Sequence, residues 1–186
     1  MPYVYDFHKN LAFGKIAESA ITRWLIERGG LVMPVYEVEQ DVDKVPRMFR
    51  QGESLIAPDL LTIGKTGPIL IEAKHKRVFT WHRLTSQWTT GIDLRHYLDY
   101  LKVQDAIPFP IWLLFLHCSD QPDGRDRPYC PARCPTGLFG GSLPTLRRCE
   151  HHRHANHGKS GMVYWSRESL KLIATRETIF GEQHKE

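Results

Sequence analysis

Residues 57–77, APDLLTIGKTGPILIEAKHKR, constrain the fold more than any other stretch, because two apolar runs flank a short turn bounded by glycines. Apolar runs separated in this way predict a β-hairpin. Each run carries a carboxylate in its middle, Asp59 in the first and Glu72 in the second. A carboxylate is strongly disfavoured in a buried strand unless something offsets its desolvation. We therefore expect the hairpin to carry a charged site on one face.

The register of the hairpin follows if the turn closes symmetrically between Lys65 and Thr66, since the numbers of paired residues then sum to 131. Asp59 faces Glu72 in this register, and Lys74 lies on the same face one step further along. The opposite face is apolar and typical of a core: Ile56, Leu60, Ile69, Ile71 and Ala73. Two carboxylates about 5 Å apart repel each other, and a bound cation resolves this, with oxygen ligands favouring Mg²⁺. The alternative is a surface hairpin whose charges are solvated.

The remaining patterns predict an α/β fold in one domain over residues 1–186. Helical spacing of apolar residues predicts a first helix over 11–28, followed by a β-like stretch over 31–39. A second helix is expected over 92–105, capped by Asp93, and a buried strand over 111–116. The apolar stripe of this second helix is predicted to comprise Leu94, Tyr97, Leu98 and Leu101.

Residues 118–160 are rich in Cys, His, Pro and Gly and predict an irregular basic insertion. Residues 161–165 then predict a last strand, and Ser166 is expected to cap a final helix. The order α-β-β-β-α-β, an insertion, then β-α, indicates a mixed central sheet flanked by helices.

Pro58-Asp59 and Glu72-Ala73-Lys74, joined by a hairpin turn and preceded by a helix that bears Glu18, resemble the PD-(D/E)xK nuclease superfamily. The resemblance covers roughly residues 10–117 and implies a restriction-endonuclease-like core. It implies a phosphodiesterase that acts on DNA with Mg²⁺ or Mn²⁺. The implied metal ligands are Asp59, Glu72 and the backbone carbonyl of Ala73. Lys74 would orient or activate the attacking water and stabilise the charge that develops on phosphorus.

The same resemblance gives Glu18 a role as a further acidic residue that reaches the metal through water; the alternative is a solvated helix residue. The short core is most similar to Holliday-junction-resolvase or phage and plasmid nucleases, and a resolvase-like activity needs a homodimer. RecB-like members carry Gln-x-x-x-Tyr on the second helix, whereas this chain has the reverse order, Tyr100-x-x-x-Gln104. A different class of function also fits, a non-catalytic DNA-binding or assembly protein that keeps the nuclease fold.

Candidate DNA contacts follow the hairpin directly, where basic residues interleave with aromatic ones over residues 74–88. Such a pattern suits neutralisation of phosphates and stacking on bases. The candidates here are Lys76, Arg77 and Arg83. The second helix adds three residues that lie off its predicted apolar stripe: Arg95, Tyr100 and Gln104. The alternatives are a solvated basic loop and a solvated helix face.

The cysteines cluster late in the chain, at Cys118, Cys130, Cys134 and Cys149, with His151, His152, His154 and His157 close behind. Thiolates and imidazoles in a loop predict a structural zinc site, built from the four cysteines or from three cysteines and a histidine. Some relatives of the resembled family hold an iron–sulphur cluster, and ordinary thiols without metal are the remaining alternative. Residues 121–159 carry seven Lys/Arg against three Asp/Glu, so the insertion is also a candidate DNA-facing flap.

Composition favours an anionic partner, since the formal net charge is +4 and the pI about 8.9. The longest apolar run, IWLLFL at 111–116, is far too short to span a bilayer. The N-terminal MPYVYDFHKN lacks the layout of a signal peptide. We therefore expect a cytoplasmic, intracellular protein with no membrane contact.

Overall fold

The computed structural model describes residues 7–35 and 46–181, with side chains of the first helix from Lys15 onward. The helices are α1 (Phe7–Glu27), α2 (Leu94–Ala106), α3 (Leu143–Arg148) and α4 (Arg176–Phe180), with a 3₁₀ helix, η1, at Arg167–Ser169. The strands are β1 (Leu31–Pro34), β2 (Arg47–Arg50), β3 (Glu53–Ile56), β4 (Leu60–Gly64), β5 (Gly67–Lys76), β6 (Thr80–His82), β7 (Gln87–Asp93), β8 (Ile111–His117), β9 (Gly137–Ser142), β10 (His152–His154), β11 (Met162–Ser166) and β12 (Lys171–Ala174).

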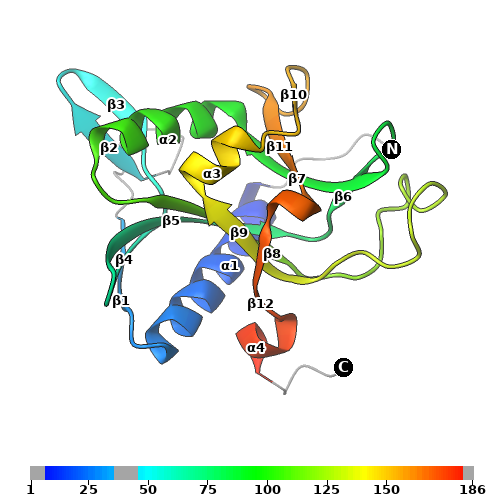
Figure 1. The fold of residues 1–186 in the computed structure, drawn as a ribbon, viewed down its shortest axis with the longest axis horizontal. Coiled ribbons are helices and arrows are strands. Elements are labelled where there is room, and N and C mark those ends of the chain that lie inside the picture. Colours follow the sequence, from blue (N-terminus) through cyan, green and yellow to red (C-terminus); the bar gives the residue numbers. More distant parts are fainter. Residues whose placement is uncertain (1–6, 36–45, 182–186) are drawn as a thin grey trace.

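Within the described residues, a central sheet of six strands has the order β1-β4-β5-β8-β9-β12. Only the β5–β8 pair in this sheet is parallel, so the sheet is mixed, and α1 and α2 lie on opposite sides of it (Figure 1). One core lies between α1 and the sheet: Ala17, Ala20, Ile21, Leu60, Ile71, Ala73 and Leu114 are among its residues. A second core lies under α2 and α3: Leu70, Tyr97, Tyr100, Val103, Leu113, Phe115 and Leu146 are among its residues. The expected class, a mixed α/β sheet flanked by helices, is confirmed.

The hairpin of β4 and β5 has the predicted register. The pairs run from Leu60↔Ile71 to Gly64↔Gly67, and each pair of numbers sums to 131. The first strand is shorter than expected, because the chain bends over residues 57–59 and the preceding β3 pairs with β2 in a separate two-stranded sheet. Pro58 lies in the bend, where its missing N–H cannot serve a ladder. The paired part of the hairpin therefore begins at Leu60, one residue after Asp59.

The second helix begins where the sequence predicts. The side chain of Asp93 accepts a hydrogen bond from the backbone N–H of Arg95 at 2.9 Å, as an N-cap residue does. The predicted apolar stripe is displaced, however. Tyr97, Tyr100 and Val103 are buried, whereas Leu98 is 44% exposed. The helix is thus rotated so that Tyr100 faces the sheet. The β-like stretch predicted over 31–39 is a strand from 31 to 34, and its last four residues lie outside the described part of the chain.

The segment 118–160 is more regular than expected. It contains β9, α3 and β10, and β9 is an inner strand of the central sheet, between β8 and β12. The predicted final helix after Ser166 is wrong. The short 3₁₀ helix η1 occurs there instead, followed by β12, because Lys171 and Leu172 pair with Gly140 and Phe139 of β9. The backbone N–H and C=O groups that a helix would satisfy internally are used in this pairing.

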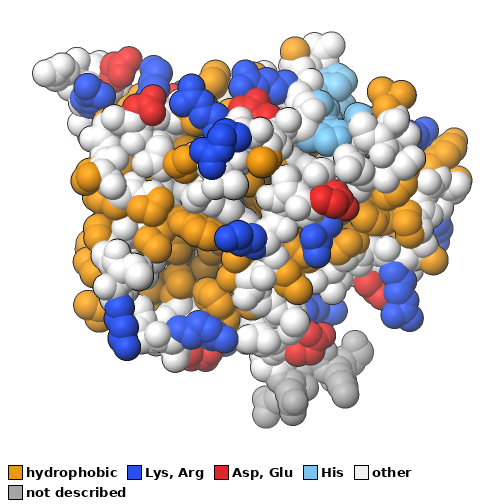
Figure 2. All heavy atoms as spheres, in the orientation of Figure 1, with side chains coloured by type: hydrophobic (Ala, Val, Ile, Leu, Met, Phe, Trp, Pro, Cys, Tyr) orange, Lys and Arg blue, Asp and Glu red, His pale blue; other side chains and the backbone are white. Residues whose placement is uncertain are grey.

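A smaller sheet has the order β10-β11-β7-β6 over the described residues. Its strands lie in the upper right of Figure 1. Figure 2 shows histidine side chains gathered on the surface near β10. No helix among the described residues is both long and apolar enough to cross a membrane.

Candidate functional site

The strand β5 carries Glu72 and Lys74 in the middle of the central sheet. Glu72 is 1% exposed, and its carboxylate forms an ion pair with the ammonium group of Lys74, whose side chain is 30% exposed. The two residues are two positions apart, so their side chains leave the same face of the strand. That face is covered by α2, whereas Ala73 between them packs on the α1 side. The charged pair therefore lies under α2, within the protein.

Asp59 reaches this pair through the backbone. Its Oδ2 accepts a hydrogen bond from the N–H of Ala73 at 2.8 Å. The predicted cross-strand pairing of Asp59 with Glu72 would follow the last pair of the ladder, which ends at Leu60. Asp59 lies in the bend instead, and its side chain takes the position that a further ladder bond would occupy.

The carbonyl of Ala73 points to the β4 side of β5. The N–H and C=O of one strand residue point to the same side, and those of the next residue point to the other. Lys76 O accepts from Cys118 N beyond β8, so the even-numbered residues of β5 face β8. Ala73 therefore faces the β4 side, and the β4 ladder has ended at Leu60. The Asp59 carboxylate and the Ala73 carbonyl therefore lie on the same side of β5.

Burial and the neighbouring carboxylates govern the charges of this cluster. Burial, and then the charge of Glu72, raise the pKa of Asp59 well above its usual range. Burial alone would lower the pKa of Lys74, but the carboxylates of Glu72 and Asp59 outweigh it and raise that pKa. Lys74 is therefore protonated, as expected from the sequence.

Glu18 adds further negative charge from α1, where its side chain is half-buried. Its charge raises the pKa of both Asp59 and Lys74, although less than Glu72 does. When both Asp59 and Glu72 are ionised, as metal ligands are, the two carboxylates and the ammonium of Lys74 sum to a net charge of −1. A divalent cation would balance it, and carboxylate and carbonyl oxygens are the donors that Mg²⁺ and Mn²⁺ prefer. The residues present therefore fit such an ion.

The helix α2 contributes two side chains that the sequence did not assign to the catalytic cluster. Tyr100 is 1% exposed, and its pKa is raised well above the usual range by burial and by the charges of Glu72 and Asp59. Its predicted DNA contact is therefore wrong, since the side chain has almost no surface. Burial, and then the charge of Lys74, lower the pKa of His96. Both residues thus line the charged cluster from α2.

Two further contacts fix α2 against the sheet near the cluster. Asp99 Oδ2 accepts from the N–H of Ile56 at 3.0 Å, which holds the end of β3 just before the bend at Asp59. Gln104 donates to the carbonyl of Phe109 at 3.2 Å and accepts from the N–H of Ile111 at 2.8 Å. Its predicted DNA contact is not supported, because both ends of its amide hold the turn before β8.

The other DNA-contact candidates are cations near the cluster. Lys76 is half-buried, and burial followed by the charge of Lys74 lowers its pKa to about 8. Arg77 and Arg95 are exposed, and Arg77 pairs with Asp123 at 3.0 Å. Arg83 is exposed too; it donates to the carbonyl of Arg125 and stacks over the ring of Tyr129. Arg77 and Arg83 therefore present charge while their side chains are held by the 118–136 loop.

The four cysteines do not converge, so the predicted four-cysteine zinc site is wrong. The sulphur of Cys118 lies 3.0 Å from Nε2 of His75, and that of Cys134 accepts from the N–H of Phe79 at 3.3 Å. Cys149 is exposed. In the described part of the chain, the three metal-binding side chains that come together are all histidines: His82, His151 and His152. Three cysteines and a histidine do not come together among the described residues either.

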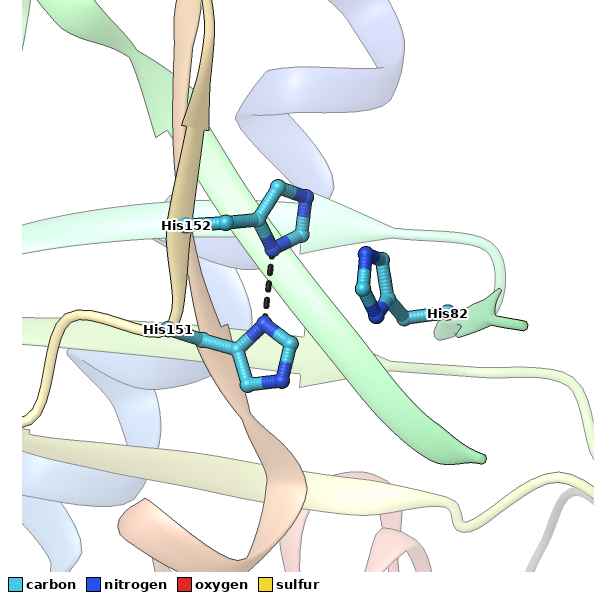
Figure 3. Close-up of side chains that lie close together, drawn as sticks. All are labelled: His82, His151 and His152. Atoms are coloured by element: carbon cyan, nitrogen blue, oxygen red, sulfur yellow. Dashed lines mark hydrogen bonds between the residues drawn. The ribbon is translucent and has the colours of Figure 1, made fainter. Parts of the chain in front are cut away.

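These three histidines, which we call the histidine cluster, come from two distant parts of the chain (Figure 3). Their candidate ligand atoms all lie within 4.8 Å of one another. Burial, and then the neighbouring His82 and His151, lower the pKa of His152 to about 4, so that ring is neutral at pH 7. The sequence placed His151 and His152 among candidate zinc ligands but offered no signal that His82, 69 residues earlier, would join them.

Comparisons with known proteins give a limited picture. No family model and no curated protein matches the sequence. Among solved structures, a Holliday junction resolvase from the archaeal hyperthermophile Archaeoglobus fulgidus is similar with a TM-score of 0.46 and 9% identity, over 84% of this chain and 90% of that one. D212, a nuclease from a fusselovirus, is similar with a TM-score of 0.38 and 12% identity, over 91% of this chain and 90% of that one. Similarity at this level leaves the function to be inferred from the residues themselves.

Proposed function

We propose that this chain is a DNA nuclease that hydrolyses phosphodiester bonds with the help of a divalent cation, Mg²⁺ or Mn²⁺. One observation carries the proposal. The buried carboxylate of Glu72, its ion pair with Lys74, and Asp59 bonded to the N–H of Ala73 form one cluster at the point where β4 stops. Burying this many charged groups costs free energy, and a fold that needed only stability would not require them.

The ligands of the cation would be the carboxylates of Asp59 and Glu72 and the backbone carbonyl of Ala73. Glu18 would act from α1 through water. When bound, such an ion polarises a phosphate oxygen and makes water more acidic. Burial and the charge of Glu72 raise the pKa of Asp59, and a bound cation would offset both effects by favouring the ionised carboxylate.

Lys74 would act by electrostatic stabilisation. Its raised pKa keeps the ammonium protonated, so it is poorly suited to remove a proton at neutral pH. Fixed positive charge at the place where negative charge develops on phosphorus lowers the barrier, because the group is already oriented when the reaction begins. The ion pair with Glu72 supplies that orientation. His96 and Tyr100 would shape the α2 side of the same site.

DNA is the proposed substrate because cations flank the cluster along the chain. Lys76 follows Lys74 on the same face of β5, Arg77 is the next residue and is exposed, and Arg95 is exposed on α2, next to His96. Figure 2 shows Lys and Arg side chains gathered over α2 and α3. A phosphate backbone is attracted by such a surface regardless of base sequence. If the preferred substrate is a four-way junction, two copies of the chain would be needed to cut two strands.

The test is a cleavage assay on the full chain with linear, circular, single-stranded and four-way DNA, in Mg²⁺, in Mn²⁺ and in EDTA. We expect cleavage that needs the cation. Asp59→Asn and Glu72→Gln should abolish it, and Lys74→Met should lower the rate by about 10²–10³-fold, as loss of an electrostatic catalytic group does. Lys65→Ala, an exposed change in the hairpin turn, is the matched control and should leave the rate unchanged.

Two results would contradict this proposal. Full cleavage by all three site variants would remove the residues from the reaction. DNA binding by the wild-type chain without cleavage in either metal would instead support the non-catalytic DNA-binding alternative. Circular dichroism of each variant confirms that a lost activity is not a lost fold.

A further inference from the structure

The histidine cluster brings the two edges of the small sheet together. His82 lies at the end of β6, and His152 begins β10, which are the opposite edge strands of the order β10-β11-β7-β6. In a flat sheet, strands three places apart would be separated by about 14 Å. The ring centroids of His82 and His152 are 4.4 Å apart. The sheet is therefore strongly curled, and the histidines lie inside the curl.

Gly91 allows this curl. It pairs with Tyr164, and a Cβ atom at position 91 would lie 2.2 Å from the carbonyl oxygen of Val163 and 2.8 Å from the ring of Tyr164. The Tyr164 ring therefore lies directly over the glycine. Tyr164 also pairs with His152 of β10, and the rings of these two residues stack at a centroid distance of 4.5 Å and an interplanar angle of 6°. The orientation of His152 is thus fixed by packing before any ligand is present.

Neighbouring polar groups select the nitrogen that each ring turns inward. Nε2 of His151 lies 3.0 Å from Oε1 of Gln87 and 3.1 Å from the hydroxyl of Thr85, and the amide oxygen favours the tautomer of His151 with its proton on Nε2. Its Nδ1 is then unprotonated and lies 2.7 Å from Nδ1 of His152. Nδ1 of His82 lies 2.8 Å from the hydroxyl of Thr85, which leaves Nε2 of His82 for a ligand. Fixing the tautomer through the outer nitrogen is the usual arrangement around a metal-bound imidazole.

We propose that His82, His151 and His152 form a binding site for one zinc ion or a similar divalent transition metal, separate from the carboxylate cluster. Neutral imidazoles suit zinc, copper and nickel far better than they suit Mg²⁺. A tetrahedral zinc ion with Zn–N bonds of about 2.0–2.1 Å holds two nitrogens about 3.3 Å apart. The His151 and His152 nitrogens must therefore separate by only about 0.6 Å, which half-buried side chains can accommodate.

The metal would link the two edge strands of the curled sheet, because His82 lies on β6 and His152 lies on β10. The three histidines leave a fourth coordination position for water or another small donor. His82 and His152 also line a cavity of about 670 Å³ together with Arg83, Asp126 and Tyr164. The fourth position is therefore within reach of molecules that enter this cavity. This role does not depend on cleavage by the Asp59 cluster.

Zinc titration of the full chain tests the site. The protein is freed of metal with EDTA, transferred to chelator-free buffer and titrated with ZnCl₂ in a calorimeter. Asp59→Asn/Glu72→Gln serves as the background, so that the carboxylate cluster does not contribute zinc binding. We expect one tight equivalent in this background. His82→Ala, His151→Ala or His152→Ala added to it should weaken binding at least 100-fold, and Gln87→Leu should weaken it about 10- to 100-fold.

His154→Ala is the matched control, since His154 lies on β10 outside the cluster and should leave zinc binding unchanged. Zinc should also raise the melting temperature of the background chain but not that of the His152→Ala chain. The site would be refuted if the background chain bound no stoichiometric zinc, or if the cluster variants bound it as well as the control. Loss of binding in Cys130→Ser or Cys134→Ser, with the cluster variants unaffected, would assign the metal to the cysteines and equally overturn the proposal.

Discussion

The central sheet and the small sheet handle chemically active side chains in opposite ways. In the central sheet, Glu72 and Lys74 are ionised groups enclosed by α2, and each is held by the charge of the other. In the small sheet, the histidine cluster consists of half-buried rings that are held by neighbours such as Gln87 and by the curl of the strands. The first arrangement depends on pairing of charge, and the second depends on backbone shape.

This difference predicts which changes each region tolerates. A buried charge that loses its partner is costly wherever the backbone lies. A neutral ring that loses a partner costs less, but it moves if the strand beneath it moves. The two sheets should therefore respond to different kinds of substitution, and the following three changes separate them in order of expected effect.

Lys74→Met should have the largest effect on stability. It leaves the carboxylate of Glu72 buried without its cation, and we expect the free energy of unfolding to fall by about 3 kcal/mol, the low end for a broken buried pair because Lys74 is 30% exposed. Urea unfolding measures this. Glu72→Gln/Lys74→Met should recover most of the loss, and Mg²⁺ should stabilise the single variant more than the double one. Equal stability of wild type and Lys74→Met would show that the ion pair contributes little.

Gly91→Ala should destabilise the small sheet by about 2 kcal/mol, because the added Cβ would collide with the carbonyl of Val163. Zinc affinity should fall together with stability, whereas cleavage by the central sheet should persist below the new melting temperature. Gly64→Ala is the control, since a Cβ there meets nothing within 4 Å. A neutral Gly91→Ala would mean that the curl is not set at this position.

His117→Leu should have the smallest effect of the three changes. It tests how a buried imidazole at the end of β8, in the central sheet, affects the pH dependence of stability. It is fully buried and stacks on Phe79 at 3.6 Å, and burial followed by the charge of Lys76 lowers its pKa well below the usual value. Below pH 6.5 the unfolded chain takes up a proton at this residue and the folded chain does not. Stability should therefore fall with decreasing pH, by about 1.4 kcal/mol per pH unit from this group.

The pH slope of urea unfolding between pH 6.5 and 5 measures the contribution of His117. His117→Leu should reduce the slope, whatever its absolute stability, and the exposed His154→Leu should keep the wild-type slope. An unchanged slope in His117→Leu would assign the acid sensitivity to other groups.

Local patterns in the sequence were sufficient for the hairpin and the second helix. The glycine-bounded turn and the alternating apolar residues predict the register of β4 and β5, and Asp93 marks the start of α2. The face of α2 was harder to predict. Leu98 is the more hydrophobic of the two residues, yet the packing of the helix against β5 buries Tyr100 and leaves Leu98 exposed.

Features that depend on distant pairing could not be predicted. The strand β9 has the sequence GLFGGS, whose glycines do not suggest a strand, yet Gly140 is required because a Cβ there would lie 2.4 Å from the carbonyl of Leu113. The histidine cluster joins His82 to His152 through the curl of a sheet, and spacing along the chain contains no trace of that curl. The predicted four-cysteine zinc site fails for the same reason, because cysteines that are close in the sequence do not come together in the described structure.

The early end of β4 has a consequence for how such a site can arise. A strand that continued to residue 58 would place Pro58 opposite Ala73, so that the Ala73 amide would bond to the Pro58 carbonyl and the carboxylate of Asp59 would have no backbone group to hold. The length of β4, set by a bend that contains Pro58, thus decides whether Ala73 of β5 is used only in sheet pairing or also in the proposed site. A change of a single residue in loop length would switch the site off while every side chain proposed for catalysis remained in the sequence.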